Sequence, residues 1–116
     1  MKKVIAEIVS LSAYESKVSK MLREEDRTAM EFFIASGPED HPVIPGAGGF
    51  RKARWARRGK GKSGGFRVIY YFLADPGQIF MAAIYAKSRK ETLSGGDQNV
   101  LAKLAAEIKK VAKGGR

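Results

Sequence analysis

Apolar residues recur at every third or fourth position in two neighbouring segments near the start of the chain. They are Tyr14, Val18, Met21 and Leu22 in the first segment, and Met30, Phe33 and Ile34 in the second, which starts at about Glu24. Such spacing places side chains on one face of a helix. Because Gly37 and Pro38 follow, and these residue types end helices, the pattern predicts a helical hairpin that stops there.

Two signals precede the first of these helices. Ser12 and Glu15 have the spacing of a capping box, in which a serine hydroxyl and a glutamate carboxylate each bond an unpaired backbone N–H at a helix start. We therefore expect the helix to begin at Ser12. The short segment Val4–Ile8 contains β-branched residues and predicts a first strand.

Three later segments have the composition and length of β-strands: Phe50–Trp55, Phe66–Leu73 and Gln78–Tyr85. A loop rich in glycine, lysine and arginine separates the first two, and Asp75-Pro76-Gly77 is a turn sequence between the last two. These strands predict a β-meander. A final amphipathic helix follows the helix-breaking segment 94–97, and its apolar positions are Val100, Leu101, Leu104, Ile108 and Val111.

The expected order of elements is β-α-α-β-β-β-α, which defines an α+β fold for this chain of 116 residues. We expect a mainly antiparallel four-stranded sheet, covered on one face by the N-terminal helical hairpin and the C-terminal helix. The length and the absence of repeats or a linker indicate one domain over residues 1–116. A domain of this size favours a shallow surface site, and we expect no cofactor.

Positive charge is concentrated in one segment. Lysine and arginine number 22 against 12 aspartate and glutamate residues, which gives a net charge of +10. Residues 51–67 contain no acidic residue and eight basic ones, so the remainder of the chain carries only +2; the eight are Arg51, Lys52, Arg54, Arg57, Arg58, Lys60, Lys62 and Arg67. Such a patch attracts a polyanion, and nucleic acid is the expected ligand. A solvated loop is the alternative explanation.

Several kinds of chemistry are excluded. The chain contains no cysteine, which rules out disulfides, thiolate metal sites and cysteine nucleophiles. Its only histidine, His41, cannot by itself form an imidazole pair or a conventional zinc site. Glu7 and Ser10 interrupt the N-terminal apolar run before it reaches the length of a signal peptide, and no segment is long enough for a membrane span. We therefore expect a cytoplasmic protein that binds no metal and no membrane.

Strand periodicity decides which basic side chains can act together. Alternate residues of a strand face opposite sides, so Lys52 and Arg54 share one face and Arg51 lies on the other. Arg67 is the one charged residue in an otherwise apolar and aromatic strand. Because a charge there is costly unless it lines a cleft, a functional role is favoured over a structural ion pair.

Glycine-rich and aromatic residues give weaker signals. Gly61-Lys62-Ser63 resembles the end of a phosphate-binding loop, but Ala56 occupies the position of the required earlier glycine and a strand follows, so we reject nucleotide hydrolysis. A core role is favoured over base stacking for the strand aromatics Trp55, Tyr70 and Tyr71. Turns with positive φ are the favoured explanation of the glycines Gly46, Gly48 and Gly49.

Three longer segments resemble a known family. They are Ile44–Trp55, in which paired basic residues follow two glycines; Gly59–Tyr71, which reads GKGKSGGFRVIYY; and Ile84–Lys87. With the element order, they resemble the HigB-like branch of the RelE toxin superfamily. The resemblance implies the toxin of a type II toxin–antitoxin module, an mRNA endoribonuclease that usually cuts codons in the ribosomal A site. It also implies a cognate antitoxin, which we expect to be a small helix-turn-helix DNA-binding protein.

The resemblance and the charge pattern together assign roles to individual residues. The expected catalytic residues are Lys52, Arg54, Arg67 and Lys87. The residues expected to bind RNA are Arg51, Arg57, Arg58, Lys60, Lys62, Arg89 and Lys90. Many family members place a tyrosine or histidine shortly after the last basic cluster, whereas residues 91–94 here are Glu-Thr-Leu-Ser. The group that transfers protons is therefore not identified.

The expected reaction is attack of an RNA 2′-hydroxyl on the adjacent phosphate, without a metal ion. It requires removal of the hydroxyl proton, stabilisation of a dianionic phosphorane and protonation of the leaving 5′-oxygen. Arginine suits the phosphorane by bidentate contact, which favours Arg54 and Arg67 for that task. Neighbouring cations disfavour the charged form of a lysine, so that it can act as a base, and Lys52 and Lys87 are the candidates.

Two other classes of function stay open. A non-catalytic RNA- or DNA-binding module would use the same patch, but it would lose affinity in small steps as single basic residues are replaced. A protein-interaction domain would use the patch only to bind an acidic partner such as an antitoxin. Codon preference, ribosome dependence, antitoxin identity and oligomeric state do not follow from the sequence.

Overall fold

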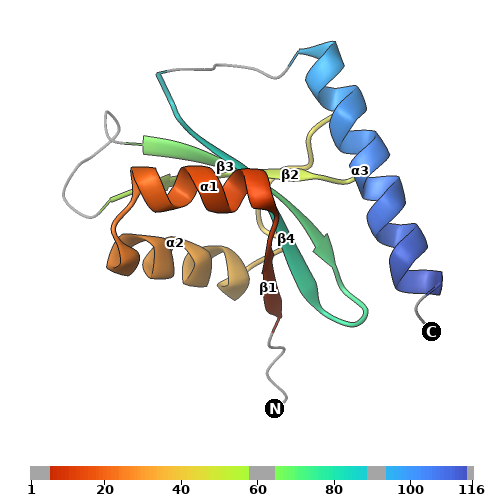
Figure 1. Ribbon diagram of the computed structural model, residues 1–116, viewed down its shortest axis with the longest axis horizontal. Helices are drawn as coiled ribbons and strands as arrows, with labels where there is room; N and C mark the ends of the chain where they lie inside the picture. The colour runs from red at the N-terminus through yellow and green to blue at the C-terminus, as the bar shows by residue number, and fades with distance from the viewer. Residues whose placement is uncertain (1–5, 58–64, 89–93, 115–116) are drawn as a thin grey trace.

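A computed structural model describes residues 6–57, 65–88 and 94–114 of the chain. Its elements follow the order β-α-α-β-β-β-α, which confirms the predicted α+β fold (Figure 1). They are β1 (Glu7–Ser10), α1 (Ser12–Met21), α2 (Glu24–Ser36), β2 (Arg51–Ala56), β3 (Gly65–Leu73), β4 (Gln78–Ala86) and α3 (Gly95–Gly114). β1 starts later than the expected strand Val4–Ile8, which lies partly outside the described residues. No helix in these ranges has the length and apolar character needed to span a bilayer.

The four strands form one sheet in the order β1-β4-β3-β2. β2, β3 and β4 are antiparallel, which confirms the meander, and β1 pairs with β4 in parallel. This parallel pair extends only from Glu7, opposite Gln78, to Ser10, opposite Met81. Among the described residues, the second half of β4 therefore has a strand on one side only.

The helical hairpin of α1 and α2 covers one face of the sheet. Tyr14, Val18, Met30 and Ile34 of these helices are fully buried. They pack against alternate strand residues, which include Ala53, Phe66, Val68, Tyr70, Ile79, Met81 and Ile84. Each helix thus removes one apolar stripe from water, as its spacing predicts. Phe33 departs from the prediction, because it is 44% exposed.

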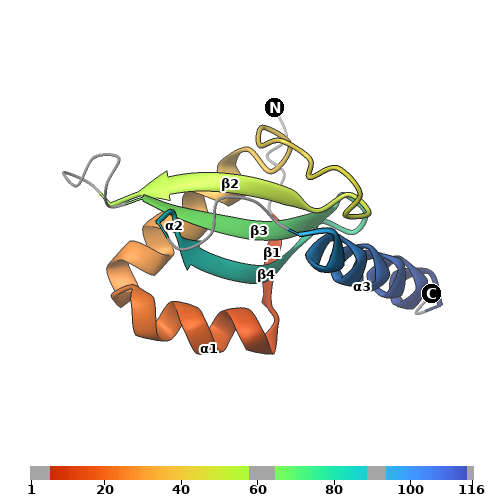
Figure 2. The same ribbon diagram turned by 90° about the horizontal axis from the view of Figure 1, so that it is seen from above.

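α3 packs on the opposite face of the sheet (Figure 2), so the expectation that all helices cover one face is wrong. Ala105 and Ile108 of α3 are buried in a second core with Ile69 and Tyr71 of β3. These β3 residues alternate with those that face the helical hairpin. β3 is apolar on both faces apart from Arg67 and therefore needs cover on both.

The loop before β2 packs closely against α3. Gly46, Gly48 and Gly49 all have positive φ, which confirms the predicted turn role. At Gly48, a Cβ atom would lie 2.9 Å from the Cβ atom of Ala105 and 3.0 Å from the Cα atom of Ala102. The absence of a side chain at Gly48 therefore also sets the distance between this loop and α3.

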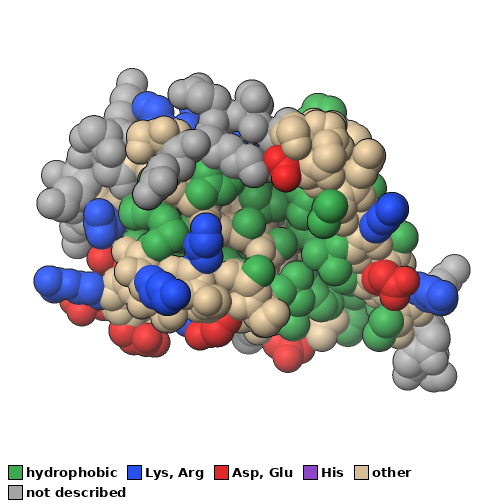
Figure 3. All heavy atoms as spheres, turned by 45° about the horizontal axis from the view of Figure 1, so that its top comes forward, with side chains coloured by type: hydrophobic (Ala, Val, Ile, Leu, Met, Phe, Trp, Pro, Cys, Tyr) green, Lys and Arg blue, Asp and Glu red, His purple; other side chains and the backbone are tan. Residues whose placement is uncertain are grey.

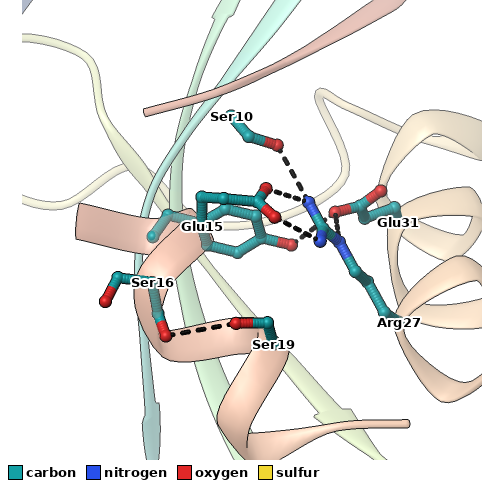
Figure 4. A network of polar contacts seen from close by, with 7 residues as sticks. Ser10, Glu15, Ser16, Ser19, Arg27 and Glu31 are labelled. Carbon is teal, nitrogen blue, oxygen red and sulfur yellow. Dashed lines mark hydrogen bonds and ion pairs between the residues drawn. The ribbon is translucent and has the colours of Figure 1, made fainter. Parts of the chain in front are cut away.

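Arg27 of α2 joins three elements through one polar network (Figure 4). Its Nη1 and Nη2 atoms donate to the two carboxylate oxygens of Glu15 at 3.0 and 2.6 Å, and its Nε atom donates to Glu31 at 2.9 Å. Nη2 also donates to the Ser10 hydroxyl at 3.1 Å, and the Tyr14 hydroxyl donates to Glu31 at 2.6 Å. The network fastens α1, α2 and the end of β1 to one another.

The predicted capping box of the first helix is wrong. α1 begins at Ser12, but its N-cap residue is Leu11 and no side chain caps it. The Glu15 carboxylate belongs instead to the network of Figure 4. Reciprocal capping bonds occur instead at the start of α3. The Asp97 N–H donates to the Ser94 hydroxyl and the Ser94 N–H donates to the Asp97 carboxylate, both at 3.1 Å. The segment 94–97, expected to precede the helix as a helix-breaking segment, therefore forms its start.

Candidate active site and nucleic-acid interface

Basic side chains from two neighbouring strands meet on the face of the sheet that α3 covers in part. In the β2–β3 register, Lys52 is directly opposite Ile69, which packs against α3, and Arg54 is directly opposite Arg67. Directly opposed residues share a face, so all three basic residues lie on the α3 side. We call Lys52, Arg54 and Arg67 the basic cluster. The structure thus brings together three of the four predicted catalytic residues.

Arg54 and Arg67 place two like charges side by side. The Lys52 N–H donates to the Pro42 carbonyl oxygen at 3.0 Å, away from β3, so the N–H of Arg54, two positions further along β2, also points away from β3. The two arginines therefore form a non-hydrogen-bonded pair, in which opposed side chains of antiparallel strands lie closest. Opposed like charges destabilise a sheet, and a bound anion would relieve the repulsion.

No acidic side chain neutralises this pair within the described residues. The ion pairs found there are those of Arg27 with Glu15 and Glu31, at the helical hairpin. With the described residues, the Arg67 guanidinium makes only a long contact, from Nη1 to the Phe66 carbonyl oxygen at 3.4 Å. A structural ion pair, the competing interpretation of Arg67, is therefore absent from the described part of the chain. These residues also contain no group of three or more metal-ligating side chains.

The basic cluster extends to the end of the sheet that α3 leaves uncovered. α3 packs on the half of β3 that begins at Ile69, towards the β3–β4 turn (Figure 2). Arg54 is exposed and Arg67 is partly buried. The sequence neighbours of Arg67 on β3, Phe66 and Val68, are buried on the other face. The core therefore fixes the backbone of Arg67, while its side chain lies on the less covered face.

β4 contributes two further side chains at this end of the sheet. Tyr85 is directly opposite Arg67 and therefore on the same face. Lys87 follows the last residue of β4, and its N–H donates to the Gly65 carbonyl oxygen at 3.0 Å, which extends the pairing with β3. Lys87 is exposed. The fourth predicted catalytic residue thus lies at the same end of the sheet, two positions after Tyr85.

Tyr85 is a candidate that sequence reasoning missed. It lies in the segment Ile84–Lys87, but alternation along one strand does not show which residue is opposite on the next. The pairing of β4 with β3 sets that register and places Tyr85 opposite Arg67 on the same face of the sheet. A phenol beside arginines can take part in proton transfer, the role that the sequence leaves unassigned.

Arg51 and Arg57, both expected to bind RNA, have structural contacts away from the basic cluster. Nη1 of Arg51 donates to the carbonyl oxygens of Glu39 at 3.2 Å and His41 at 2.8 Å, which ties the preceding loop to β2. The Cζ atom of Arg57 lies 5.3 Å from the ring centroid of Phe66, in the helical-hairpin core. The other predicted RNA-binding residues lie outside the described part of the chain: Arg58, Lys60, Lys62, Arg89 and Lys90.

Tyr70 and Tyr71 belong to the two cores, which confirms the core interpretation for both. The Tyr70 hydroxyl donates to the Pro38 carbonyl oxygen at 2.7 Å, and burial raises the pKa of Tyr70 to about 12. Burial also lowers the pKa of His41, whose ring centroid lies 5.2 Å from that of Phe33. These groups hold the loop before β2 and lie apart from the basic cluster.

The sequence profile of one known family matches most of this chain. The family is described as the RelE toxin of the RelE / RelB toxin-antitoxin system, and the match spans residues 45–114. The chain belongs to the RelE toxin family. In this RelE-family protein, the matched region contains β2, β3, β4 and α3. It therefore contains the whole basic cluster. Membership of the superfamily is confirmed, while assignment to its HigB-like branch stays a prediction.

A solved structure shows the same fold as this RelE-family chain. A double arginine-to-alanine mutant of E. coli toxin RelE in the free state matches it with a TM-score of 0.55 at 14% sequence identity. The match covers 76% of this chain and 90% of that chain. At this identity, the likeness concerns the arrangement of helices and strands.

Proposed function

We propose that this member of the RelE toxin family is an mRNA endoribonuclease. The observation that carries the proposal is the Arg54–Arg67 pair, which no carboxylate neutralises within the described residues. Guanidinium groups form charge-assisted, bidentate hydrogen bonds with phosphate. Because two packed strands hold the pair in place, it suits a charge that develops on phosphorus during a reaction.

The proposed reaction is attack of an RNA 2′-hydroxyl on the adjacent phosphorus, with departure of the 5′-oxygen. Arg54 and Arg67 stabilise the dianionic phosphorane. Lys52, Lys87 and Tyr85 are the candidates for the two proton transfers, because they lie on the same face and at the same end of the sheet. The arginines supply the positive charge, so the scheme uses no metal ion and no cofactor.

The size of the expected rate enhancements favours a role for the ribosome in positioning the substrate. A positioned acid or base contributes about 10²–10⁴-fold to a rate, and holding reactants in the right geometry can contribute more. A site on an open sheet does little to position a flexible RNA, so we propose that the ribosome presents the mRNA to the toxin in the cytoplasm. The proposed inhibitor is a cognate antitoxin, a small helix-turn-helix DNA-binding protein.

Primer extension on mRNA from cells induced to express the chain tests the proposal. We expect growth arrest and new 5′ ends within translated codons for the wild-type protein, but not for Arg54→Ala or Arg67→Ala. Lys103→Ala is the matched control, since it removes one charge from the exposed side of α3. Intact transcripts and normal growth, with the wild-type protein shown to be folded, would overturn the nuclease in favour of a binding module or an interaction domain.

A further inference from the structure

The spacing of core residues in β4 changes part-way along the strand. Ile79 and Met81 are two positions apart and both are fully buried in the helical-hairpin core, as strand alternation requires. The next residue of β4 in that core is Ile84, three positions further on. Ala82 and Ala83, which lie between them, both pack against the second core, on the α3 side of the sheet. β4 therefore contains one residue more than regular alternation allows.

The pairing with β3 locates this extra residue. Tyr70 of β3 is opposite Met81, and its neighbour Ile69 is opposite Ala83. In this register Ala82 is opposite no residue of β3, which is the arrangement of a β-bulge. A bulge bends its strand and increases the local right-handed twist. The two halves of β4 are therefore turned relative to each other at Ala82.

Two other boundaries of the sheet coincide with the bulge. β1 pairs with β4 only as far as Met81, where the Leu11 N–H donates to the Met81 carbonyl oxygen at 3.1 Å. On the α3 side of β3, Ile69 is buried beneath the helix, whereas Arg67 is only partly buried. Figure 3 shows a related division on the surface, with hydrophobic side chains towards α3 and most Lys and Arg side chains of this view at the opposite end. The bulge thus separates the braced half of β4 from the half that carries the candidate site.

The bulge also decides which side chain of β4 faces Arg67. If regular pairing continued beyond Met81, Ile84 would be opposite Arg67, and Tyr85 would be opposite Phe66 on the helical-hairpin face. The observed register instead places Tyr85 opposite Arg67 and keeps Ile84 in the core, where it is 2% exposed. The extra residue therefore makes an apolar core and a polar site compatible on one strand.

We propose that the bulge at Ala82 positions Tyr85 against Arg67, as the proposed catalysis requires. Ala82 is then a positioning residue, which acts through the backbone twist that it adds to β4. This twist sets the angle at which Tyr85 and the later Lys87 approach the basic cluster. The inference rests on the proposed nuclease function and adds the element that orients two of its candidate proton-transfer groups. The competing explanation is a bulge that only turns the open edge of β4 away from other strands.

Deletion of Ala82 removes the bulge and is the main test. The register should hold on both sides, because a slip of either half by one residue would move Ile79 or Ile84 out of the core. Tyr85 should stay opposite Arg67 but lose the angle that the bulge gives it. We expect a single-turnover cleavage rate about 10- to 100-fold lower, the cost of a small misplacement, with RNA affinity unchanged to within about threefold.

A double-mutant cycle with Tyr85→Phe shows whether the deletion acts through the phenol. If it does, deletion of Ala82 should lower the rate of Tyr85→Phe little further, so that the two losses are not additive. Ala82→Ser is the conservative variant: it keeps the number of residues, and therefore the bulge, and should cut at the wild-type rate. Ala82→Gly is the second test variant, needed if the deletion does not fold. It frees the backbone at the bulge and should lower the rate several-fold, again only when Tyr85 is present.

Nuclear Overhauser effects between the Tyr85 ring and the Arg67 side chain measure the placement without any cleavage. Directly opposed residues of antiparallel strands have Cβ atoms about 4.5–5.5 Å apart, so these signals should be present in the wild-type protein and in Ala82→Ser. They should weaken or move to other ring protons in the deletion variant and in Ala82→Gly. Thermal melting shows that the proteins compared are folded.

Three results would overturn the proposal. A folded deletion variant that cuts at the wild-type rate would reduce the bulge to an edge device. Additive losses in the cycle would show that it does not act through Tyr85. Unchanged Overhauser effects between Tyr85 and Arg67 in the folded variants would show that it does not position the ring. Absence of cleavage by the wild-type protein would overturn the nuclease instead, and the Overhauser effects would then decide alone whether the bulge places Tyr85 against Arg67.

Discussion

Arg67 combines a fixed backbone with a charge that the described structure leaves unneutralised. Arg67→Ala should lower the single-turnover cleavage rate by about 10²–10³-fold, the effect of losing one preorganised donor. Thermal stability should change little, because Arg67 has no ion pair with a described residue to lose and one repulsion with Arg54 is removed. Cleavage and melting should be measured on the same preparation.

Arg51 is the control for this prediction, because its guanidinium is bonded to the loop before β2. Arg51→Ala should lower the melting temperature, while the folded fraction keeps the wild-type cleavage rate. If Arg67→Ala instead melts much earlier and cuts normally while folded, Arg67 is a structural charge and the active face has been misplaced.

The hydroxyl of Tyr85 can be tested without disturbing the packing of its ring. Tyr85→Phe should lower the cleavage rate on the order of 10²-fold and alter its pH profile, if the phenol transfers a proton. A rate and pH profile equal to those of the wild-type protein would reduce Tyr85 to a packing residue.

At the residue scale, strand alternation alone is enough to predict that Lys52 and Arg54 share one face. Alternation alone does not predict that Arg54 lies opposite Arg67, or that Arg67 lies opposite Tyr85. Those pairs depend on the register between strands, which the turns and the bulge between Ile69 and Tyr70 set.

At the scale of elements, a local pattern and a tertiary contact compete for the same group. Ser12 with Glu15, and Ser94 with Asp97, have the same capping spacing in the sequence. Only the second pair forms capping bonds, because the N-cap of α1 is Leu11, which places Ser12 inside the first turn, and the Glu15 carboxylate is bound by Arg27 of the neighbouring helix. The sequence shows both patterns, but it shows neither the exact residue at which α1 starts nor the tertiary contact of Glu15 with Arg27.

The contact between Glu15 and Arg27 makes a prediction about acid stability. Hydrogen bonds from Arg27 hold the pKa of Glu15 below its usual range. A carboxyl with a depressed pKa in the folded state stabilises the fold above its unfolded-state pKa, about 4.3, and this contribution is lost as the pH falls through the folded-state pKa. Wild-type protein should therefore melt above Glu15→Gln at neutral pH, and the difference should vanish in acid. A difference that stays constant across pH would show that Arg27 contributes through packing alone.

At the scale of the whole molecule, the sequence predicts the order of the elements. It does not predict on which face of the sheet each helix packs. Apolar spacing locates every helix and strand to within a few residues. The side on which α3 packs depends on a core that joins it to the loop around Gly48 and to Ile69 and Tyr71, residues far apart in the sequence. This placement matters for function, because α3 covers one half of the sheet face and leaves the other half to the basic cluster.

The distribution of charge over the molecule gives the last prediction. Three acidic residues begin α2, on the hairpin side, whereas Lys52 and Arg54 lie on the other face of the sheet. For single-stranded RNA, each phosphate contact contributes about 0.7 to the slope of log affinity against log salt concentration. Lys52→Ala combined with Arg54→Ala should therefore lower the magnitude of that slope by about 1.4.

Lys103→Ala combined with Lys110→Ala is the matched control for the salt slope. It removes the same net charge from exposed positions on α3 and should leave the slope unchanged. If both double variants lower the slope equally, RNA senses the total charge of the protein and not a defined cluster. Only a difference between two proteins of identical net charge would locate the RNA on the face that carries Arg54 and Arg67.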